Sequence, residues 1–178
     1  LLKASSLTGW RNKRNSNKLL MTRIWIAALL LLAVTSGCAS KKTIMMTGPD
    51  GRIKVAFNLT GEGQPVYTVL YNDTAVITEG NLGITRSDAD FSSGLRFDSV
   101  TGPEEVRESY SLLHGKKRDA SYSALMHTVH LSGSSGESMD IIFRISDDGL
   151  AFCYRFPGES QEMKYITAEK SSFGFAEG

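Results

Sequence analysis

The sequence lacks the local motifs by which many enzymes are recognised. It contains no nucleophile elbow, no phosphate-binding loop and no zinc motif. It also has no internal repeat at a fixed period, which argues against a propeller or a solenoid. Its longest apolar run, Ile24–Val34, has eleven residues, whereas a transmembrane helix needs about 20. The residues alone therefore give no case for an enzyme or for an integral membrane protein.

Charge is distributed unevenly along the chain, although the net charge is only +1. Residues 1–38 contain six Lys or Arg residues and no acid, and residues 39–178 contain fourteen Lys or Arg residues against nineteen Asp or Glu residues. Nucleic-acid-binding proteins show a basic surface, which the mildly acidic main part of the chain lacks. We therefore expect no nucleic-acid partner and assign the basic block to targeting.

The segment 21–37 has the pattern of an export signal. Met21 and Arg23 form a short charged region, Ile24–Val34 forms the apolar region, and small residues then lead to Cys38. This arrangement resembles a bacterial lipobox, so Cys38 is predicted to be lipidated and to become the mature N-terminus. Stable anchoring takes more than one acyl chain. The prediction is a lipoprotein at the outer membrane, facing the periplasm or the cell surface, with residues 38–43 as a tether.

Two smaller expectations follow from the lipobox. Residues 1–20 are polar and basic and begin with Leu1, so we interpret them as upstream sequence before the true start at Met21, or else as an extended signal region. With Cys38 lipidated, Cys153 has no disulfide partner. We expect Cys153 to be a small buried residue rather than a nucleophile.

Alternating apolar and polar residues dominate the chain from Ile44 onward, and the segment 44–178 is predicted to be one all-β domain. Some nine or ten short strands, separated by turn residues, favour an antiparallel β-sandwich without helices. The strand that begins at Leu95 is expected to stop at Gly102-Pro103, and Ser87–Gly94 is expected to be a loop. The predicted strands are Ile44–Met46, Ile53–Leu59, Val66–Tyr71, Thr74–Thr78, Leu82–Ile84, Leu95–Ser99, Leu125–Leu131, Met139–Ile145, Leu150–Phe156 and Tyr165–Lys170.

The clearest single feature is a predicted β-hairpin around Asp147-Asp148-Gly149. These three residues are typical of a tight turn. The strand after the turn places Leu150, Phe152, Tyr154 and Phe156 on one face, with Ala151, Cys153 and Arg155 on the other. Asp147 and Asp148 are therefore interpreted as turn residues rather than as a catalytic pair.

Four other groups of polar residues could suggest chemistry. Asp88–Gly94 resembles the start of a calcium loop, but its glycine is one place late and Ser99 stands where Glu is needed, so a solvated loop is preferred. His127 and His130 lie three apart on a strand and hence on opposite faces, which predicts one packed and one surface histidine. His114–Arg118 is a basic loop of the solvated kind. Glu104 and Glu105 are adjacent, which does not make a catalytic pair. No catalytic, cofactor or metal residue is predicted.

Several blocks in the same order resemble the N-terminal domain of glycoside hydrolase family 97, the bacterial α-glucosidase and α-galactosidase family common in Bacteroidetes. The resemblance covers roughly residues 44–175. The blocks are Gly48–Ile53, Pro65–Val69 with Tyr71-Asn72, Leu82–Ile84, Asp90–Leu95, Tyr110–Lys117, Ile141–Arg144 and Asp147–Pro157. Cys153 departs from the family pattern, in which a longer polar residue such as Arg is expected.

The resemblance implies a supersandwich like that of galactose mutarotase, which in full-length members packs against a C-terminal (β/α)₈ barrel. It also implies α-linked oligosaccharides as ligands, and calcium and catalytic residues located beyond this chain. The chain is therefore expected to be an inactive, incomplete N-terminal piece of an exported α-glycosidase, with a reading frame that continues into a barrel. The alternatives are a non-catalytic lipoprotein that binds glycans or a partner protein, and the product of a decayed gene.

Overall fold

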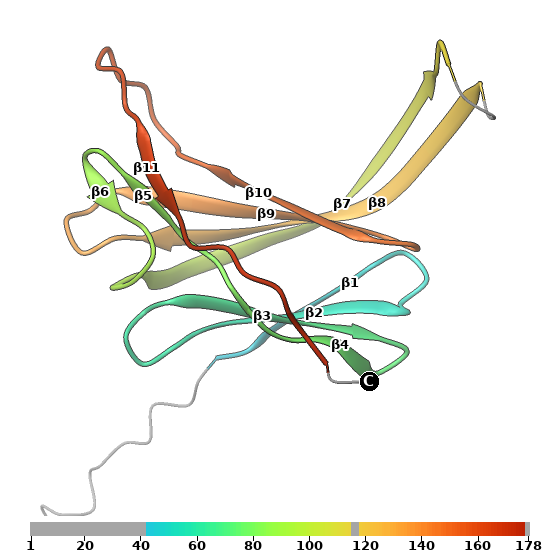
Figure 1. Ribbon diagram of the computed structural model, residues 1–178, viewed down its shortest axis with the longest axis horizontal. Coiled ribbons are helices and arrows are strands. Elements are labelled where there is room, and N and C mark those ends of the chain that lie inside the picture. Colours follow the sequence, from blue (N-terminus) through green and yellow to red (C-terminus); the bar gives the residue numbers. More distant parts are fainter. Residues whose placement is uncertain (1–41, 115–117, 177–178) are drawn as a thin grey trace, which may run out of the picture. The chain divides into compact units, whose positions relative to one another are not determined.

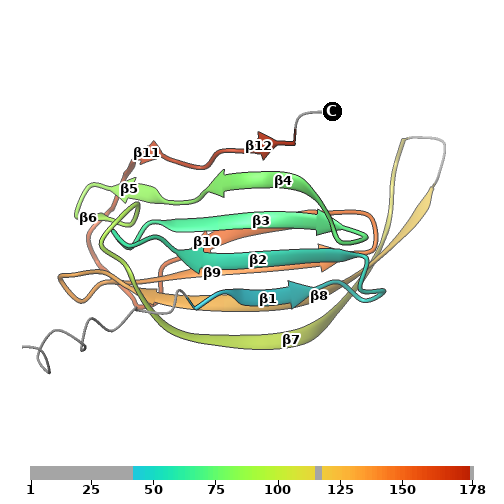
Figure 2. The same cartoon turned by 90° about the horizontal axis from the view of Figure 1, so that it is seen from below.

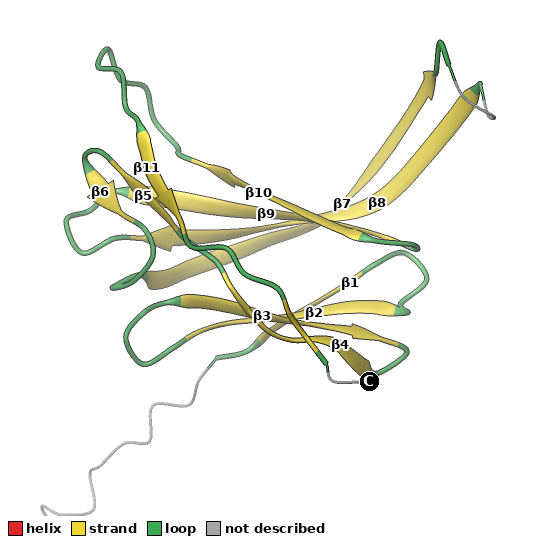
Figure 3. Ribbon diagram, in the orientation of Figure 1, coloured by secondary structure: helices red, strands yellow, loops and turns green. Residues whose placement is uncertain are grey.

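The computed structural model describes residues 42–114 and 118–176, which form strands and no helix (Figure 3). The all-β prediction is thus confirmed for these residues, and they contain no helix able to span a membrane. The signal segment and Cys38 lie outside the described residues. Residues 41–178 form a compact unit with a hydrophobic core of its own, as an independently folding domain does.

Twelve strands follow one another along the described residues. They are β1 (Ile44–Thr47), β2 (Ile53–Leu59), β3 (Pro65–Tyr71), β4 (Thr74–Asn81), β5 (Ile84–Arg86), β6 (Ala89–Asp90), β7 (Arg96–Ser111), β8 (Asp119–Ser132), β9 (Ser138–Ser146), β10 (Leu150–Arg155), β11 (Ile166–Glu169) and β12 (Gly174–Phe175).

The strands form three antiparallel sheets. One has the order β1-β2-β3-β4-β12, a second has the order β10-β9-β8-β7, and a small third sheet has the order β11-β5-β6. The two larger sheets lie face to face, as the views of Figure 1 and Figure 2 show. This is the arrangement of a β-sandwich.

The core lies between these two sheets and follows from the period-two pattern of the sequence. On β2 and β9 every second residue points inward, so that Val55, Phe57, Ile141 and Phe143 are fully buried. Phe57 and Phe143 meet edge to face across the core, with ring centroids 6.1 Å apart, a geometry that aromatic pairs favour. Burial of these apolar side chains is the main force that holds the sheets together.

The predicted hairpin is confirmed as β9 and β10, with residues 147–149 as its turn. Leu150, Phe152, Tyr154 and Phe156 pack against the core, as the alternation predicts. The prediction for Cys153 was wrong, because this residue is exposed. Its neighbours Phe152 and Tyr154 occupy the inward face of β10, which leaves Cys153 on the outward face.

The expected end of a strand at Gly102-Pro103 was also wrong, because β7 continues through these residues to Ser111. The register shifts between Thr101 and Glu104, so Gly102 and Pro103 together lie opposite His127. A proline is tolerated at such a bulge, where no ladder hydrogen bond is required of it. Gly102 has a φ of 104°, and a Cβ there would lie 2.5 Å from the Met126 carbonyl oxygen, so the bulge requires glycine.

The bulge precedes a long extension of the β7–β8 ladder. Strand β8 pairs with β9 only as far as Ala124, whereas its pairing with β7 continues to Asp119. We call the two-stranded extension, residues 107–111 and 119–123, the β7–β8 arm. It projects away from the two packed sheets (Figure 1).

The third sheet adds a further correction. Ser87–Gly94 was expected to be a loop, but Ala89 and Asp90 form the short strand β6, which pairs with β5. The last described strands return to the start of the domain: β11 pairs with β5, and β12 pairs with β4. Strand β10 remains at the edge of its sheet.

Candidate functional site

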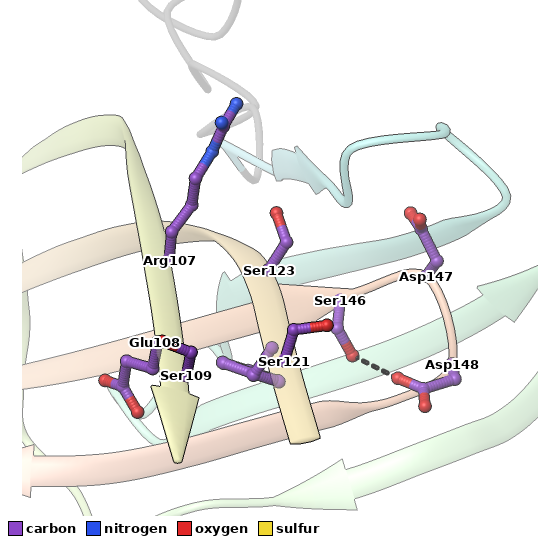
Figure 4. Close-up of a pocket in the computed structure, with 9 residues that line it drawn as sticks. Arg107, Glu108, Ser109, Ser121, Ser123, Ser146, Asp147 and Asp148 are labelled. Atoms are coloured by element: carbon purple, nitrogen blue, oxygen red, sulfur yellow. Dashed lines mark hydrogen bonds between the residues drawn. The ribbon is translucent and has the colours of Figure 1, made fainter. Parts of the chain in front are cut away.

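A pocket with many polar side chains lies where the β7–β8 arm leaves the sheet. Its volume is about 630 Å3, and its walls come from the arm and from the turn between β9 and β10 (Figure 4). The lining residues are Arg107, Glu108, Ser109, Ser121, Tyr122, Ser123, Ser146, Asp147 and Asp148.

Strand register explains why the arm contributes a polar wall. Arg107 lies opposite Ser123, and Ser109 lies opposite Ser121. All four residues share one face of the arm, because side chains on a strand alternate between its two faces. Figure 4 shows Arg107, Ser123 and Asp147 pointing to the same side of the pocket. Three serine hydroxyls and a guanidinium therefore line one side of the pocket.

Hydrogen bonds within the β9–β10 turn fix the opposite wall. The Ser146 hydroxyl lies 2.7 Å from Asp148 Oδ1 and 3.1 Å from the Gly149 carbonyl oxygen, and the Ser146 amide donates to that same carbonyl at 2.9 Å. Asp147 Oδ1 accepts the Asp50 amide at 3.1 Å. Among the described residues, the second carboxylate oxygens of Asp147 and Asp148 receive no hydrogen bond. They can therefore accept one from a ligand.

Asp50 joins this wall to the turn between β1 and β2. Its Oδ1 accepts the Arg52 amide at 2.9 Å, and its Oδ2 pairs with the Arg52 guanidinium. The backbone hydrogen bond from Arg52, followed by its guanidinium, lowers the pKa of Asp50. The amide of Asp50 reaches Asp147, so the two turns hold one another in place.

Arg107 and Glu108, two charged side chains of the arm, both form ion pairs. Arg107 pairs with Glu105 at 2.5 Å, and Glu108 pairs with Arg144 at 3.0 Å. All four side chains are well exposed, so each pair contributes little to stability. The pocket thus offers hydroxyls, three carboxylates, one guanidinium and the Tyr122 ring. Such groups bind a polyhydroxylated ligand, whereas no histidine or cysteine in the lining could serve as a nucleophile–base pair.

A second pocket is apolar. It has a volume of about 340 Å3 and lies between β3, β4 and β10. Most of its lining is apolar or aromatic, with Asp148 as the only charged group. This lining does not suit a sugar, which needs several polar partners. The lining residues are Ile53, Tyr67, Val69, Tyr71, Val76, Ile77, Asp148, Gly149, Leu150, Phe152 and Phe173.

The two histidines of β8 lie on opposite faces, as predicted. His127 is buried on the core side, and its Nε2 lies 3.3 Å from the Thr47 carbonyl oxygen. Burial lowers the pKa of His127, which keeps the ring neutral so that Nε2–H can donate to that carbonyl. His130 lies on the outer face of the sheet, with its side chain 27% exposed.

His130 belongs to a hydrogen-bonded network that the sequence analysis did not predict. The network takes one residue from each of four neighbouring strands: Thr101, His130, Asp140 and Arg155. His130 Nδ1 lies 2.8 Å from Asp140 Oδ1, and its Nε2 lies 3.1 Å from the Thr101 hydroxyl. Arg155 donates from Nε and Nη2 to Asp140 Oδ2, at 2.9 and 2.7 Å. The pairing of Asp140 with Arg155 in the hairpin register is the signal that could have revealed it.

The loop compared with a calcium site does not gather its carboxylates. Asp88 pairs with Arg86 and with Lys164, and the Arg86 hydrogen bond is the main cause that holds its pKa well below the usual range. Asp90 instead accepts hydrogen bonds from Ser92. Residues 42–114 and 118–176 contain no group of three or more His, Cys, Asp or Glu side chains placed to hold a metal.

Comparison with known proteins finds a family model and a relative that are both glycoside hydrolases. The family model described as Glycosyl-hydrolase 97 N-terminal matches residues 46–178. A probable retaining alpha-galactosidase from Streptomyces bingchenggensis is 28% identical over 153 residues, which are 83% of this chain and 23% of that protein. This chain therefore spans about a quarter of the length of that relative.

Solved structures agree with this match. The crystal structure of a beta-arabinopyranosidase is 26% identical with a TM-score of 0.69, over 75% of this chain and 21% of that one. A glycoside hydrolase family 97 enzyme from Pseudoalteromonas sp. strain K8, solved in complex with acarbose, is 21% identical with a TM-score of 0.64, over 74% and 20%. At 21% identity, the likeness to the Pseudoalteromonas enzyme shows a shared fold. Because the family model matches most of the chain, this protein belongs to the glycosyl-hydrolase 97 N-terminal family.

Proposed function

We propose that the chain is the accessory N-terminal domain of an exported α-glycosidase and that it binds α-linked oligosaccharides. The family match over residues 46–178 carries the proposal. In this proposal a separate (β/α)₈ barrel supplies the catalysis, and the sandwich is the start of a supersandwich of the galactose mutarotase type. One relative, solved both with panose and with acarbose, supports an oligosaccharide as the ligand.

The polar pocket is the proposed binding site. Serine hydroxyls and the free oxygens of Asp147 and Asp148 would accept hydrogen bonds from sugar hydroxyls, and Arg107 would donate to them. Tyr122 adds an apolar ring surface. The pocket is open and most of its arm residues are exposed, so water competes for every hydrogen bond. We therefore expect weak binding, with a Kd of about 1 mM, which corresponds to about −4 kcal/mol.

Calorimetry on residues 39–178 tests this site with maltotriose and with an α-galactoside. Arg107→Ala should weaken binding at least threefold, because the pocket loses its only cation. Arg96→Ala is the matched control, since Arg96 is an exposed arginine at the other end of the same strand. Absence of heat at about ten times the expected Kd, or equal weakening by both variants, would refute the proposed site.

We also propose that Cys38 carries the lipid anchor of an outer-membrane lipoprotein. Expressed from Met21 in a bacterium, the wild-type protein should fractionate with membranes, and Cys38→Ala should move it to the soluble fraction because the acyl chains are lost. Cys153→Ala is the control, because Cys153 is an exposed thiol on β10 and its loss should change nothing. Unchanged partitioning of the Cys38→Ala protein would contradict lipidation.

A further inference from the structure

The sequence contains two Asp-Gly dipeptides, Asp50-Gly51 and Asp148-Gly149, and no Asn-Gly dipeptide. The two lie in turns that contact one another, since the Asp50 amide donates to Asp147 Oδ1 at 3.1 Å. An aspartate followed by glycine is prone to form a succinimide, because glycine has no Cβ to shield its amide nitrogen. These two positions are therefore where the main chain can rearrange spontaneously.

Rearrangement at an Asp-Gly dipeptide takes two steps. The glycine nitrogen attacks the aspartate Cγ and an N–Cγ bond forms, while the carboxyl hydroxyl and the amide hydrogen leave together as water. A water molecule then adds to the original main-chain carbonyl of the succinimide ring and breaks its bond to the glycine nitrogen. The product is isoaspartate, whose main chain runs through Cγ and is longer by a methylene group. One water is released and one is consumed, so the reaction is an isomerisation that needs no oxidant or reductant.

Asp50-Gly51 is restrained at both reacting groups. Asp50 Oδ1 accepts the Arg52 amide at 2.9 Å, and Oδ2 pairs with the Arg52 guanidinium. The backbone hydrogen bond, followed by the guanidinium, lowers the pKa of Asp50, so less of its carboxyl carries the hydroxyl that must leave. The Gly51 amide donates to the Gly48 carbonyl oxygen at 3.1 Å. Its nitrogen has to give up that hydrogen bond before it can attack.

Asp148-Gly149 lacks both restraints. The Asp148 carboxylate accepts the neutral Ser146 hydroxyl at 2.7 Å, and no cation pairs with it among the described residues. Within the same part of the chain, the Gly149 amide donates no hydrogen bond, although the Gly149 carbonyl oxygen accepts two from Ser146. Asp148 is also exposed, so water for the second step is at hand. The two dipeptides thus share a sequence and differ in their surroundings.

We propose that Asp148 is a site of spontaneous isoaspartate formation in the folded protein and that Asp50 is protected from the same reaction. Isoaspartate would lengthen the turn between β9 and β10 and would move the Asp148 carboxylate to a new position. That turn is one wall of the polar pocket, so the pocket would change shape as the protein ages. This consequence for sugar binding rests on the function proposed above, whereas the isomerisation does not depend on it.

Peptide mapping of aged protein measures the two sites separately. Trypsin releases Asp50-Gly51 within residues 43–52 and Asp148-Gly149 within residues 145–155, and liquid chromatography separates each isoaspartate peptide from its aspartate form of equal mass. The folded segment 39–178 is kept in mildly acidic buffer at physiological temperature. Isoaspartate should form at Asp148 at least about tenfold faster than at Asp50, which corresponds to about 1.4 kcal/mol in activation free energy. In guanidinium chloride the two rates should become similar, because only the local sequence then acts.

Single substitutions test the proposed cause at each site. Gly149→Ala should slow the reaction at Asp148 at least threefold, because a Cβ shields the attacking nitrogen. The φ of Gly149 is not positive, and its added Cβ would lie 3.9 Å from Ser146 Oγ, an ordinary contact. Arg52→Ala should accelerate the reaction at Asp50 at least threefold and leave Asp148 unchanged. Gly61→Ala, which adds a Cβ in open space in another turn, is the matched control and should change neither rate.

Three results would overturn the proposal. The first is equal rates in the folded protein, or a faster rate at Asp50. The second is the absence of isoaspartate at Asp148 under conditions in which the unfolded chain forms it. The third is a product that electron-transfer fragmentation assigns to Asp147, which shares the tryptic peptide with Asp148. No sugar enters these measurements, so freshly prepared protein that fails to bind sugar would refute the proposed function and leave the isomerisation standing.

Discussion

Replacing Phe143 by alanine is expected to lower the free energy of unfolding by about 3–5 kcal/mol, the usual cost of removing a buried phenylalanine ring. Phe143 is fully buried at the centre of β9. Its ring contacts Phe57 of the other large sheet and Phe152 of β10, with centroid distances of 6.1 and 6.3 Å. Alanine would leave a cavity that these rings cannot fill without breaking the contact between the sheets.

Urea unfolding of residues 39–178, followed by circular dichroism, measures this loss. Phe175→Ala is the matched control, because Phe175 is 74% exposed on β12, and its replacement should change stability by less than about 0.5 kcal/mol. A loss below about 1 kcal/mol for Phe143→Ala would mean that the sheets do not pack through this residue.

Asp140→Ala is expected to cost about 2–3 kcal/mol, in the range of hydrogen bonds made to a charged group. The Asp140 side chain is 4% exposed and accepts hydrogen bonds from both Arg155 and His130. Without the carboxylate, the His130 ring loses its partner at Nδ1. The guanidinium of Arg155 is 56% exposed, so it regains water, which keeps the loss below that of a fully buried pair.

The same urea measurement can separate this network from an ordinary surface contact. Asp98→Ala is the control, because Asp98 accepts a hydrogen bond from Ser132 in an exposed position on the same sheet. A double-mutant cycle with Arg155→Ala should show coupling of at least about 0.5 kcal/mol between Asp140 and Arg155. Equal losses of unfolding free energy for Asp140→Ala and Asp98→Ala would show that the hydrogen-bonded network across the four strands adds no stability.

Much of the fold can be predicted from the sequence, because antiparallel strands with one buried face alternate in hydrophobicity. The hairpin of β9 and β10 follows from this alternation and from its Asp-Asp-Gly turn. Asn72 and Asp73 form a two-residue turn between β3 and β4, with φ angles of 47° and 64°, as hairpins of this kind require. The opposite faces of His127 and His130 follow from the same period.

The exposure of Cys153 could have been predicted from its own strand, because the large side chains of β10 take the face that meets the core. The course of β7 needed information that no single segment carries. Passage of β7 through Gly102-Pro103 depends on its partner strand, where His127 lies opposite two residues instead of one. Local propensity predicts a break at that point, and the ladder of β8 overrides it.

The candidate site was less predictable than the fold. Asp147 and Asp148 were identified as turn residues, which is confirmed by their hydrogen bonds to Asp50 and Ser146. Their position beside Ser121 and Ser123 depends on the register of β8 against β7 and β9. Register is set by the packing of whole strands, so a pocket lined by three strands leaves no motif in the sequence.

The return of β11 and β12 to β5 and β4 bears on the order in which the chain can fold. The Tyr67 hydroxyl lies 3.3 Å from the Ser172 carbonyl oxygen, across 105 positions of sequence, and Gly174 pairs with Glu79. During synthesis, β4 therefore waits for its neighbour until almost all of the described chain has emerged. Contacts so distant in sequence slow folding, so a nascent chain of this kind exposes an unpaired sheet edge until its last strands arrive.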